Sequence, residues 1–483
     1  MAKLDLSQIR HDLIAGVVVF LIALPLSLGI ALASGVPPAA GIMAALVGGL
    51  VVPIFSGSRF SVSGPAAGLA TVSLASLTQL GSFEAFLAAV ILAGAIQIGL
   101  GFLRAGGIAG LVPAAVIQGM LAAIGISLIA TQLPTLLGAS TNSWHPLALG
   151  IGILAIALLA IYPRLKLPAA LQTIPPQLAV VVLGGIAVLI AARAGAGLGG
   201  GFLLNLPGGS EFFTALPRPD FAVFIEPAVW SVALTLALIA SLETLLNVEA
   251  IDRMDPAKHK TPSNRELKAQ GVGNMVSGLL GGLPITSVIV RSSANLSAGA
   301  KSKLSIVIHG VLLLLAVLVL TPLLAWVPLA VLAAVVIMTG YKLASPAVVA
   351  QALKGGPESS LPFAAALILG VTSNLLVGVA AGTAISLVFL LVRQQRLGPE
   401  IEHRGNHLRI VLPEITSFLH RSRLEAALEQ VQPGHSVELD LGKLHYCTQE
   451  IHHLIEAFLQ DSARRGIPVQ IKKSNREANY ELK

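Results

Sequence analysis

The sequence has few charged residues, which make up 11% of its 483 positions, against about 25% in an average soluble domain. Hydrophobic residues make up 55%, and apolar runs recur from Asp12 to about Gln395. This composition excludes a soluble globular chain and predicts an all-α polytopic membrane protein. Cys447 is the single cysteine, which excludes an intramolecular disulfide framework. The run from Leu13 to Ala33 is too long for the core of a signal peptide and is expected to be the first span.

Motifs of intramembrane enzymes are also missing. The apolar spans hold neither an HExxH motif for a metal nor a GxSxG context for a nucleophile. His309, the only histidine in such a span, stands alone. Near the C-terminus, His445, His452 and His453 lack the i, i+4 spacing of a helical metal pair, so surface histidines are expected. The sequence therefore predicts no catalytic residue, no metal site and no enzyme.

Fourteen membrane segments are predicted from the apolar runs. They cover residues 12–33, 38–56, 63–79, 84–103, 111–130, 146–163, 175–194, 226–247, 268–281, 287–298, 303–324, 327–343, 361–378 and 380–396. With a cytoplasmic N-terminus, the inside loops hold most basic residues, and the outside loops hold only Arg193 and Arg218. This asymmetry follows the positive-inside rule. The formal net charge of +7 is therefore a topology signal that calls for no nucleic-acid partner, and both termini are expected in the cytoplasm.

Two pairs of similar motifs indicate that the halves of the membrane region are related. Leu111-Val-Pro113 opens the fifth segment and Trp326-Val-Pro328 the twelfth, while Ser63-Gly-Pro65 opens the third and Gly282-Leu-Pro284 the tenth. Each pair lies seven segments apart, and an odd offset gives the two halves opposite orientations. The motifs therefore predict a 7+7 inverted repeat. The alternative is coincidence, because Val-Pro and Gly-Pro are common in membrane helices.

The tenth segment is the least regular one. The stretch Gly281–Gly299 is interrupted by glycines and by Pro284, whereas a full span needs about 20 apolar residues. Arg291 follows within two turns, and a charge at this depth needs a partner or a function. We interpret the stretch as a half-helix whose N-terminus and arginine face an anion. The alternative is that Arg291 pairs with Glu243 and ties two segments together.

The third segment is predicted to oppose the tenth, so that two helix N-termini face one substrate. Such N-termini carry partial positive charge and free N–H groups, which favour an oxyanion. The small residues of the third segment allow close backbone approach. The residues expected at the substrate in these two segments are Ser63, Gly64, Ala66, Ala67, Gly68, Thr286, Ser287, Val288, Ile289 and Arg291.

Glu243 lies near the cytoplasmic end of the eighth segment and is interpreted as a coupling carboxylate. Asn247 follows one turn later and Thr244 is adjacent, so oxygen atoms suited to a hard cation such as Na⁺ gather there. A bound Na⁺ is the only cofactor considered. The alternative is a snorkelling or helix-capping carboxylate near the interface. An uncoupled anion channel is disfavoured, because such a pore needs no buried acid.

Several motifs, in their order and spacing, make the chain similar to the SulP/SLC26 anion transporters along nearly its whole length. These motifs are Asp12-Leu-Ile-Ala-Gly16, Leu24-Pro25 with Ala31-x-x-Ser-Gly35, Gly57-Ser58, Ser63-Gly-Pro65, Ser241-Leu-Glu-Thr-Leu-Leu246, Gln270-Gly-x-Gly-Asn274, Gly281-Gly-x-Pro284 and Arg291-Ser292. The resemblance implies a core domain of segments 1–4 and 8–11 that moves as an elevator against a gate domain of segments 5–7 and 12–14. It also implies a substrate held between the N-termini of segments 3 and 10, a homodimer and a cytoplasmic STAS domain.

Departures from the family pattern favour bicarbonate. Sulfate-type members have a glutamine after the proline of the first segment, whereas Leu26 here removes a polar side chain near the substrate, as in the bicarbonate members. The run Ile289–Ser305 resembles a bacterial branch associated with carbonic anhydrases, which implies the bacterial inner membrane and a carbonic anhydrase as a partner. Na⁺ is the favoured driver, because H⁺ with bicarbonate would deliver only the equivalent of CO₂. Glu243 and Asn247 replace an Asp and a Thr of those members, so a sulfate:H⁺ symporter or another anion carrier or exchanger stays open.

The residues after 398 differ from the membrane region. Their pattern predicts strands at 407–412, 436–441 and 468–471 and helices over 415–430 and 448–465. Residues 1–398 are thus expected to form the transporter domain among membrane lipids, and residues 399–483 a small α/β domain that resembles a short STAS domain. Thr448 is its only candidate phosphorylation acceptor. Dimer contacts or partner docking are its expected roles.

Overall fold

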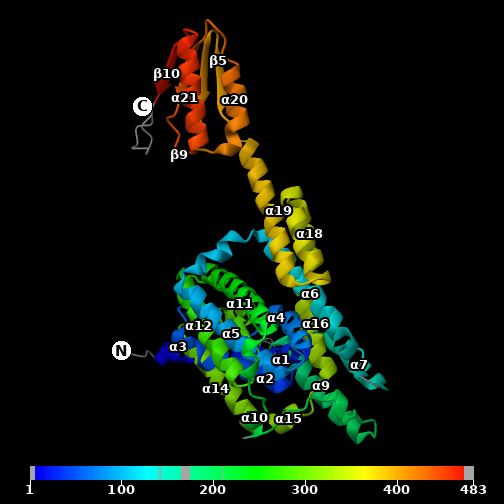
Figure 1. Ribbon diagram of the computed structural model, residues 1–483. Coiled ribbons are helices and arrows are strands. Elements are labelled where there is room, and N and C mark those ends of the chain that lie inside the picture. The colour runs from blue at the N-terminus through cyan, green and yellow to red at the C-terminus, as the bar shows by residue number, and fades with distance from the viewer. Residues whose placement is uncertain (1–5, 141–142, 165–173, 210, 397, 473–483) are drawn as a thin grey trace. The chain divides into compact units, whose positions relative to one another are not determined.

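The chain consists of a helical unit and a small α/β unit. The computed structural model describes residues 6–140, 143–164, 174–209, 211–396 and 398–472. By its contacts the chain divides into a helical unit, Met1–Thr383, and a C-terminal unit, Ala384–Lys483; Figure 1 shows the elements of both. The division falls inside the last helix of the membrane region, and the domain boundary predicted after residue 398 follows the end of that helix.

The helical unit contains long helices together with several short ones. Its α-helices are α1 (Leu6–Ala33), α2 (Pro38–Leu50), α3 (Val52–Phe55), α4 (Ala67–Leu80), α5 (Phe83–Phe102), α6 (Ala114–Leu136), α7 (Pro146–Ile161), α9 (Pro176–Arg193), α10 (Glu211–Thr214), α11 (Pro227–Met254), α12 (Ser263–Leu279), α13 (Ile289–Ser297), α14 (Leu304–Val319), α15 (Thr321–Leu324), α16 (Leu329–Leu343), α17 (Pro346–Lys354), α18 (Pro357–Thr372) and α19 (Leu375–Arg396). The short strands are β1 (Ser63–Pro65), β2 (Ala139–Ser140), β3 (Ser143–Trp144) and β4 (Ile285–Ser287), and the 3-10 turns are η1 (Ala105–Leu111), η2 (Tyr162–Arg164), η3 (Gly200–Phe202) and η4 (Ala222–Ile225).

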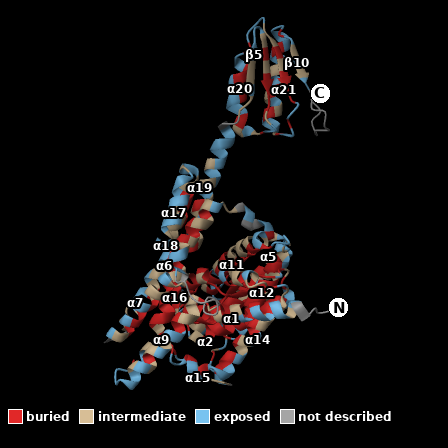
Figure 2. Cartoon of the chain, turned by 180° about the vertical axis from the view of Figure 1, so that it is seen from behind, coloured by how far each residue is buried: buried red, intermediate tan, exposed pale blue. Residues whose placement is uncertain are grey.

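The centre of the helical unit is α2, which carries no polar side chain and is buried from Ala39 to Gly49. A helix that is apolar on all sides is stable only when neighbours surround it. Leu28 of α1, Ile42 of α2 and Leu332 of α16 belong to the same core and are at most 1% exposed. Figure 2 shows buried residues gathered around these three helices.

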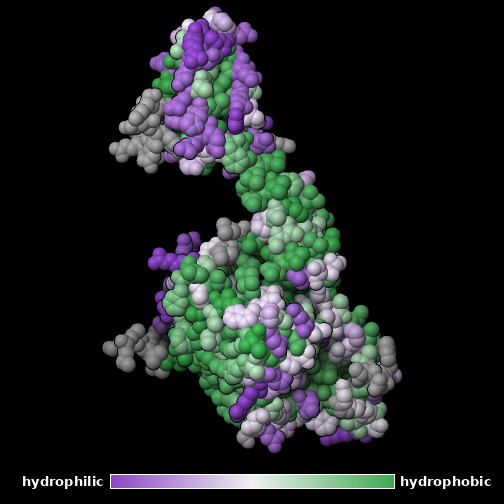
Figure 3. All heavy atoms as spheres, in the orientation of Figure 1, coloured by the Kyte–Doolittle hydropathy of each residue, from purple (hydrophilic) through white to green (hydrophobic). Residues whose placement is uncertain are grey.

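The outer surface of the helical unit is apolar. Eight helices in the described part of the chain are long and apolar enough to cross a membrane, and three shorter apolar helices accompany them. Each of the fourteen predicted ranges holds a helix, preceded in the third and tenth by a three-residue strand. Figure 3 shows hydrophobic side chains over much of the visible surface of this unit, as expected where helices face lipid. The protein is therefore a multi-pass membrane protein.

Two short strands meet in the interior of the helical unit. The antiparallel pair β1–β4 has the register Ser63 with Ser287, Gly64 with Thr286 and Pro65 with Ile285. After one further residue β1 leads into α4 at Ala67, and β4 leads into α13 at Ile289. The first strand–helix unit thus begins at Ser63 and the second at Ile285. The motif comparison aligned Ser63 with Gly282, which lies three residues before Ile285. The proline match was therefore in the wrong register, because Pro284 lies before the strand and Pro65 lies within it.

The C-terminal unit contains one sheet with helices on one face. Its strands β5 (Glu400–Arg404), β6 (His407–Val411), β8 (Ser436–Asp440) and β10 (Val469–Lys472) have the order β10-β8-β6-β5, in which only β5 is antiparallel. Helices α20 (Arg421–Glu429) and α21 (Gln449–Arg464) pack on Leu408, Ile410, Val437 and Leu439 of that sheet. The short pair β7 (Ile415–Thr416) and β9 (Tyr446–Cys447) and the turn η5 (Phe418–His420) complete the unit.

Two features of the C-terminal unit differ from the predicted pattern. Strand β5 was not predicted; it pairs with β6 through the two-residue turn Gly405–Asn406, in which Gly405 has φ +63°. A glycine at positive φ is typical of such hairpins. The predicted helix over 415–430 is wrong in its first turns, because β7 and η5 occupy them and α20 begins only at Arg421.

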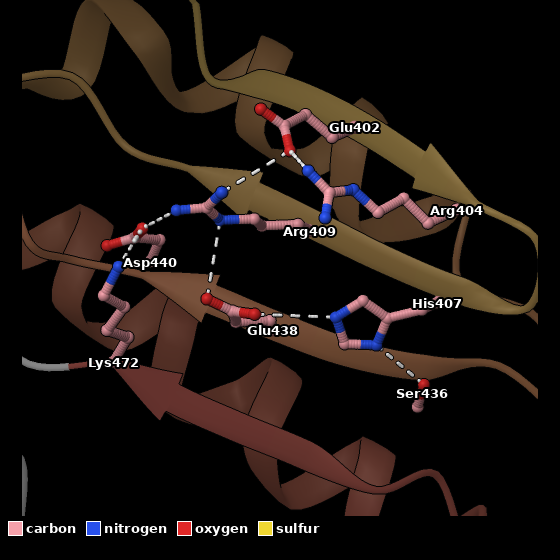
Figure 4. A network of polar contacts seen from close by, with 8 residues as sticks. All are labelled: Glu402, Arg404, His407, Arg409, Ser436, Glu438, Asp440 and Lys472. Atoms are coloured by element: carbon pink, nitrogen blue, oxygen red, sulfur yellow. Dashed lines mark hydrogen bonds and ion pairs between the residues drawn. The ribbon is translucent and has the colours of Figure 1, made fainter.

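The sheet face opposite the helices carries a network of charged side chains, which Figure 4 shows. Arg409 lies at its centre and pairs with Asp440, with Glu438 at 3.4 Å and with Glu402 at 3.5 Å. Lys472 reaches Asp440 at 3.3 Å. Burial opposes ionisation of Asp440, but hydrogen bonds from Arg409, the Gly442 amide and Lys472 outweigh it and hold the pKa of this carboxyl below its ordinary value. Alternation along the strands separates this polar face from the apolar one.

Candidate functional site

The two helix N-termini at the ends of β1 and β4 form the framework of the site. Ala66 is the N-cap of α4 and Val288 the N-cap of α13, and neither side chain caps its helix. Serine, threonine, asparagine or aspartate at these positions would have satisfied first-turn N–H groups. Alanine and valine leave those groups available to a ligand. Ala67 and Ile289, also predicted at the substrate, are the first residues of the two helices.

Arg291 lies in the first turn of α13 and is fully buried. Its Nη2 donates to Ser27 Oγ of α1 at 3.0 Å, while Nε and Nη1 have no hydrogen-bond partner among the described residues. Its Cζ would lie 3.2 Å from a Cβ on Gly64, and its Nη1 would lie closer still, so the guanidinium packs directly on the backbone of β1. A buried donor without an acceptor is costly. Two such donors on one guanidinium are suited to the oxygen atoms of an oxyanion.

Glu243 of α11 faces the N-terminus of α4. Its Oε2, Oε1 and Cδ would lie 2.6, 2.7 and 2.8 Å from a Cβ on Gly68, so the carboxylate occupies the place that a side chain would take. Its Oε2 is shielded from solvent and has no hydrogen-bond partner within the described part of the chain. No ion pair joins Glu243 to Arg291 in the part of the chain that the structure describes, so the alternative in which these two residues tie segments together has no contact to support it.

Thr244 and Asn247 lie on the same helix as Glu243 and contact β4. The Ser287 amide donates to Thr244 Oγ1 at 3.3 Å, and Asn247 Nδ2 donates to the Ser287 carbonyl at 2.6 Å. These two predicted cation ligands thus hold the strand that leads into α13. No hydrogen bond to the side-chain carbonyl oxygen of Asn247 is found among the described residues.

The remaining predicted substrate residues are placed around the strands. Ser63 Oγ accepts from Gln270 Nε2 at 2.6 Å, Ser287 Oγ pairs with Ser61 Oγ, and Thr286 Oγ1 donates to the Ser287 carbonyl at 3.1 Å. These hydroxyls are therefore engaged within the protein. Leu26 lies in the hydrophobic core and is 4% exposed, whereas the next residue along α1, Ser27, provides the contact to Arg291.

A cavity of about 340 Å³ separates α4 and α11 from α6, α18 and α19. It is lined by uncharged polar side chains together with apolar ones, among them Thr71, Gln79, Thr235 and Asn374. Its lining includes neither Glu243 nor Arg291. Gln79, Thr235 and Asn374 were not identified from the sequence, because isolated threonines and amides in membrane helices usually serve packing.

The sequence profile of the sulfate permease family matches residues 9–366. The chain belongs to this family, the SulP/SLC26 anion transporters. YvdB of Bacillus subtilis, a sulfate transporter by name, is 31% identical over 83% of the chain and 77% of its own length. The bicarbonate transporter BicA of Picosynechococcus is 26% identical over 82% of the chain and 73% of its own length.

Two solved structures share the fold of this sulfate permease family member. The transmembrane domain of a cyanobacterial bicarbonate transporter, BicA, superposes with a TM-score of 0.67 at 24% identity and covers 80% of this chain and 99% of that one. The overall structure of SLC26A9 superposes with a TM-score of 0.83 at 15% identity and covers 98% of this chain and 86% of that one. At these identities the likeness concerns the fold alone.

Proposed function

We propose that the protein is a secondary active transporter that takes up a small inorganic oxyanion, bicarbonate in the first place, together with a cation. The observation that carries the proposal is the fully buried Arg291, whose Nε and Nη1 lack partners beside two uncapped helix N-termini. Planar guanidinium N–H groups match the oxygen atoms of an oxyanion, and helix N-termini add backbone donors and positive partial charge.

Coupling to a cation follows from the position of Glu243. Its carboxylate lies against Gly68 in the first turn of α4, where the substrate anion would also bind. Two negative charges at one helix end repel each other unless a proton or a metal cation accompanies them. For bicarbonate Na⁺ is the better driver, because a proton would convert the cargo into the equivalent of CO₂. The carbonyl oxygen of Asn247 and the hydroxyl of Thr244 are the neighbouring donors to such a cation.

The proposed transport cycle is an elevator motion. The core comprises α1 to α5 and α11 to α14, and the gate comprises α6 to α9 and α16 to α19, in two inverted halves of seven segments. The cavity between α4 and α11 on one side and α6, α18 and α19 on the other supports this division. The C-terminal unit, whose four-stranded sheet carries two helices on one face, would serve as the STAS domain. A homodimer in a bacterial inner membrane, with both termini in the cytoplasm and a carbonic anhydrase as partner, completes the proposal.

Sulfate uptake with H⁺ is the second candidate. It is favoured by YvdB, whose name denotes a sulfate transporter and which is more similar in sequence to this chain than the two BicA proteins are. In that case Glu243 would carry the proton, and the Arg291 site would stay the same.

Labelled uptake into proteoliposomes distinguishes these candidates. Bicarbonate and sulfate are offered separately, each with an inward Na⁺ gradient and then with an inward H⁺ gradient. Bicarbonate uptake that requires Na⁺ supports the proposal, and loss of that uptake in Arg291→Ala ties it to the site. Sulfate uptake driven by H⁺ would establish the second candidate. Uptake of neither anion would refute both candidates.

A further inference from the structure

Helix α12 carries a row of polar side chains into the interior. Glu266, Gln270 and Asn274 are spaced four residues apart, which places them on one face of the helix, and each is at most 1% exposed. Buried polar side chains within a membrane domain are costly unless they are fully engaged. The row contains the first and last residues of the motif Gln270-Gly-x-Gly-Asn274, to which the proposed function assigns no role.

The side chain of Asn274 makes the hydrogen bonds to β4 that a neighbouring strand would otherwise make. Its Oδ1 accepts from the Ile285 amide at 2.6 Å, and its Nδ2 donates to the Ile285 carbonyl at 3.0 Å. One side-chain amide thus satisfies both backbone groups of one strand residue, as a paired strand would. An open strand edge is not tolerated in the membrane interior. The same Nδ2 donates to Gln97 Oε1 of α5 at 2.7 Å, and Gln97 Nε2 donates to Ser241 Oγ of α11 at 3.3 Å.

Gln270 ties β1 to the same helix. Its Nε2 donates to Ser63 Oγ at 2.6 Å and to Glu266 Oε1 at 3.1 Å. Glu266 Oε2 in turn accepts from Ser56 Oγ at 2.7 Å and from the Gly57 amide at 3.2 Å, so the segment between α3 and β1 is held as well. One rigid helix therefore holds the first residue of β1 and the first residue of β4.

We infer that Asn274 and Gln270 are positioning residues, which fix β1 and β4 to α12 and thereby set the gap between the N-termini of α4 and α13 that the oxyanion bridges. Neither residue contacts the anion. The inference rests on the proposed function, because the gap matters only if an anion binds there. The hydrogen bonds of Asn274 and Gln270 should also stabilise the fold, which can be tested without a transport assay.

The variant Asn274→Asp replaces one donor by an oxygen and changes little else. The new carboxylate still accepts from the Ile285 amide, but its second oxygen then faces the Ile285 carbonyl and Gln97 Oε1, which are both acceptors. Protonation of that oxygen restores a donor. At pH 9 we expect apparent substrate affinity at least about tenfold below that of the wild type at the same pH, because a buried hydrogen bond is replaced by a contact between acceptors, and recovery to within about threefold at pH 6.

Asn264→Asp is the matched control on the same helix. Among the described residues, the side chain of Asn264 has one hydrogen bond, in which Oδ1 accepts from the Gly106 amide at 2.8 Å, and an aspartate accepts equally well. This control should transport as the wild type does at every pH. Each ratio is taken to the wild type at the same pH, which cancels the titration of Glu266, Glu243 and the substrate itself.

Thermal unfolding of detergent-solubilised protein provides the second readout and does not depend on transport. Asn274→Asp should unfold at a lower temperature than the wild type at pH 9 and regain most of the difference at pH 6, while Asn264→Asp follows the wild type. If Asn274→Asp cannot be purified folded, Gln270→Glu takes its place, because its carboxylate would face the carboxylate of Glu266. Its substrate affinity and unfolding temperature should then recover on acidification in the same way.

The possible outcomes distinguish a failure of this inference from a failure of the proposed function. If Asn274→Asp has the same apparent substrate affinity as the wild type at every pH, the inference is overturned while oxyanion transport stays intact. The absence of any oxyanion uptake by the wild type would refute the proposed function, and the pH-dependent unfolding would then still decide whether Asn274 anchors β4. A loss of affinity that acidification does not restore would also overturn the inference, because it would indicate general damage.

Discussion

Gly68→Ala tests the geometry around Glu243. A methyl group at this position would lie 2.6 to 2.8 Å from the Glu243 carboxylate, whereas non-bonded atoms prefer a separation of about 3.5 Å. The carboxylate must therefore move by about 0.8 Å, away from the first turn of α4. Gly68 has ordinary helical geometry, since it does not occur among the residues with positive φ, so the backbone itself accepts alanine.

The effect on stability should be small. Replacing glycine by alanine in a helix stabilises by roughly 0.5–1 kcal/mol, and overpacking costs roughly 1–3 kcal/mol when the neighbour cannot move. Here the neighbour is the end of a flexible side chain whose Oε2 has no partner to lose, so the cost falls at the low end. The two terms nearly cancel. The effect on transport should be large, because a displacement near 1 Å of a positioned group costs about 10- to 100-fold.

Cation-dependent uptake in proteoliposomes is the assay, with thermal unfolding measured in parallel. Gly68→Ala should raise the cation concentration for half-maximal uptake by about 10- to 100-fold at an unfolding temperature close to that of the wild type. Gly99→Ala is the matched control, because Gly99 is also helical and a Cβ there meets nothing within 4 Å. Unchanged cation dependence in Gly68→Ala would refute the placement of Glu243 at the N-terminus of α4.

Three further predictions concern single residues. Glu243→Gln should preserve folding and uptake down the anion gradient but abolish the response to a cation gradient; a persisting response in the uptake assay would show that coupling lies elsewhere. Asp440→Asn should increase amide exchange in β6 and β8 at neutral pH. Burial opposes ionisation of Asp440, but hydrogen bonds from Arg409 and Lys472 hold its pKa below the ordinary value, so the stability it contributes is present at neutral pH and declines as pH falls below about 4; an exchange difference that did not shrink between pH 7 and pH 3 would contradict this. Burial raises the pKa of the Cys447 thiol to about 11, so iodoacetamide at pH 8 should modify it roughly a hundredfold more slowly in the folded than in the denatured chain, and equal rates by mass spectrometry would contradict its buried position.

The sequence reveals those parts of the site that carry an uncompensated charge. Arg291 and Glu243 stand out because a charge in an apolar segment needs a reason, and the structure places both beside the helix N-termini that begin after β1 and β4. The breaks at Gly281 and Pro284 likewise indicate the half-helix, because they leave a segment too short to cross a membrane as one helix.

Other parts of the site depend on contacts between distant segments. Ser27 meets Arg291 across 264 positions of the chain, and Asn274 meets Gln97 across 177. A serine or an asparagine in a membrane helix has no periodicity that predicts such a partner. Leu26 was predicted at the substrate from the family resemblance, but it lies in the hydrophobic core. Successive residues of a helix point about 100° apart, and it is the next residue, Ser27, that contacts Arg291.

Local competition explains the differences in the C-terminal unit. The helix predicted over 415–430 loses its first turns because Ile415 and Thr416 pair with Tyr446 and Cys447. Strand β5 was not predicted because its sequence, Glu400 to Arg404, is mostly charged and lacks the apolar pattern of a buried strand. Such a sequence is typical of an edge strand.

The central claim is that an oxyanion binds between the N-termini of α4 and α13 beside Arg291. Solid-state NMR of the protein in lipid bilayers, with ¹³C-labelled bicarbonate and ¹⁵N-labelled arginine, measures this contact directly through the dipolar coupling between the two labels. The account predicts a coupling between bound bicarbonate and a guanidinium nitrogen in the wild type that disappears in Arg291→Lys, which retains a positive charge but has no guanidinium. Bicarbonate that binds the wild type without such a coupling, or a coupling that survives in Arg291→Lys, would contradict it.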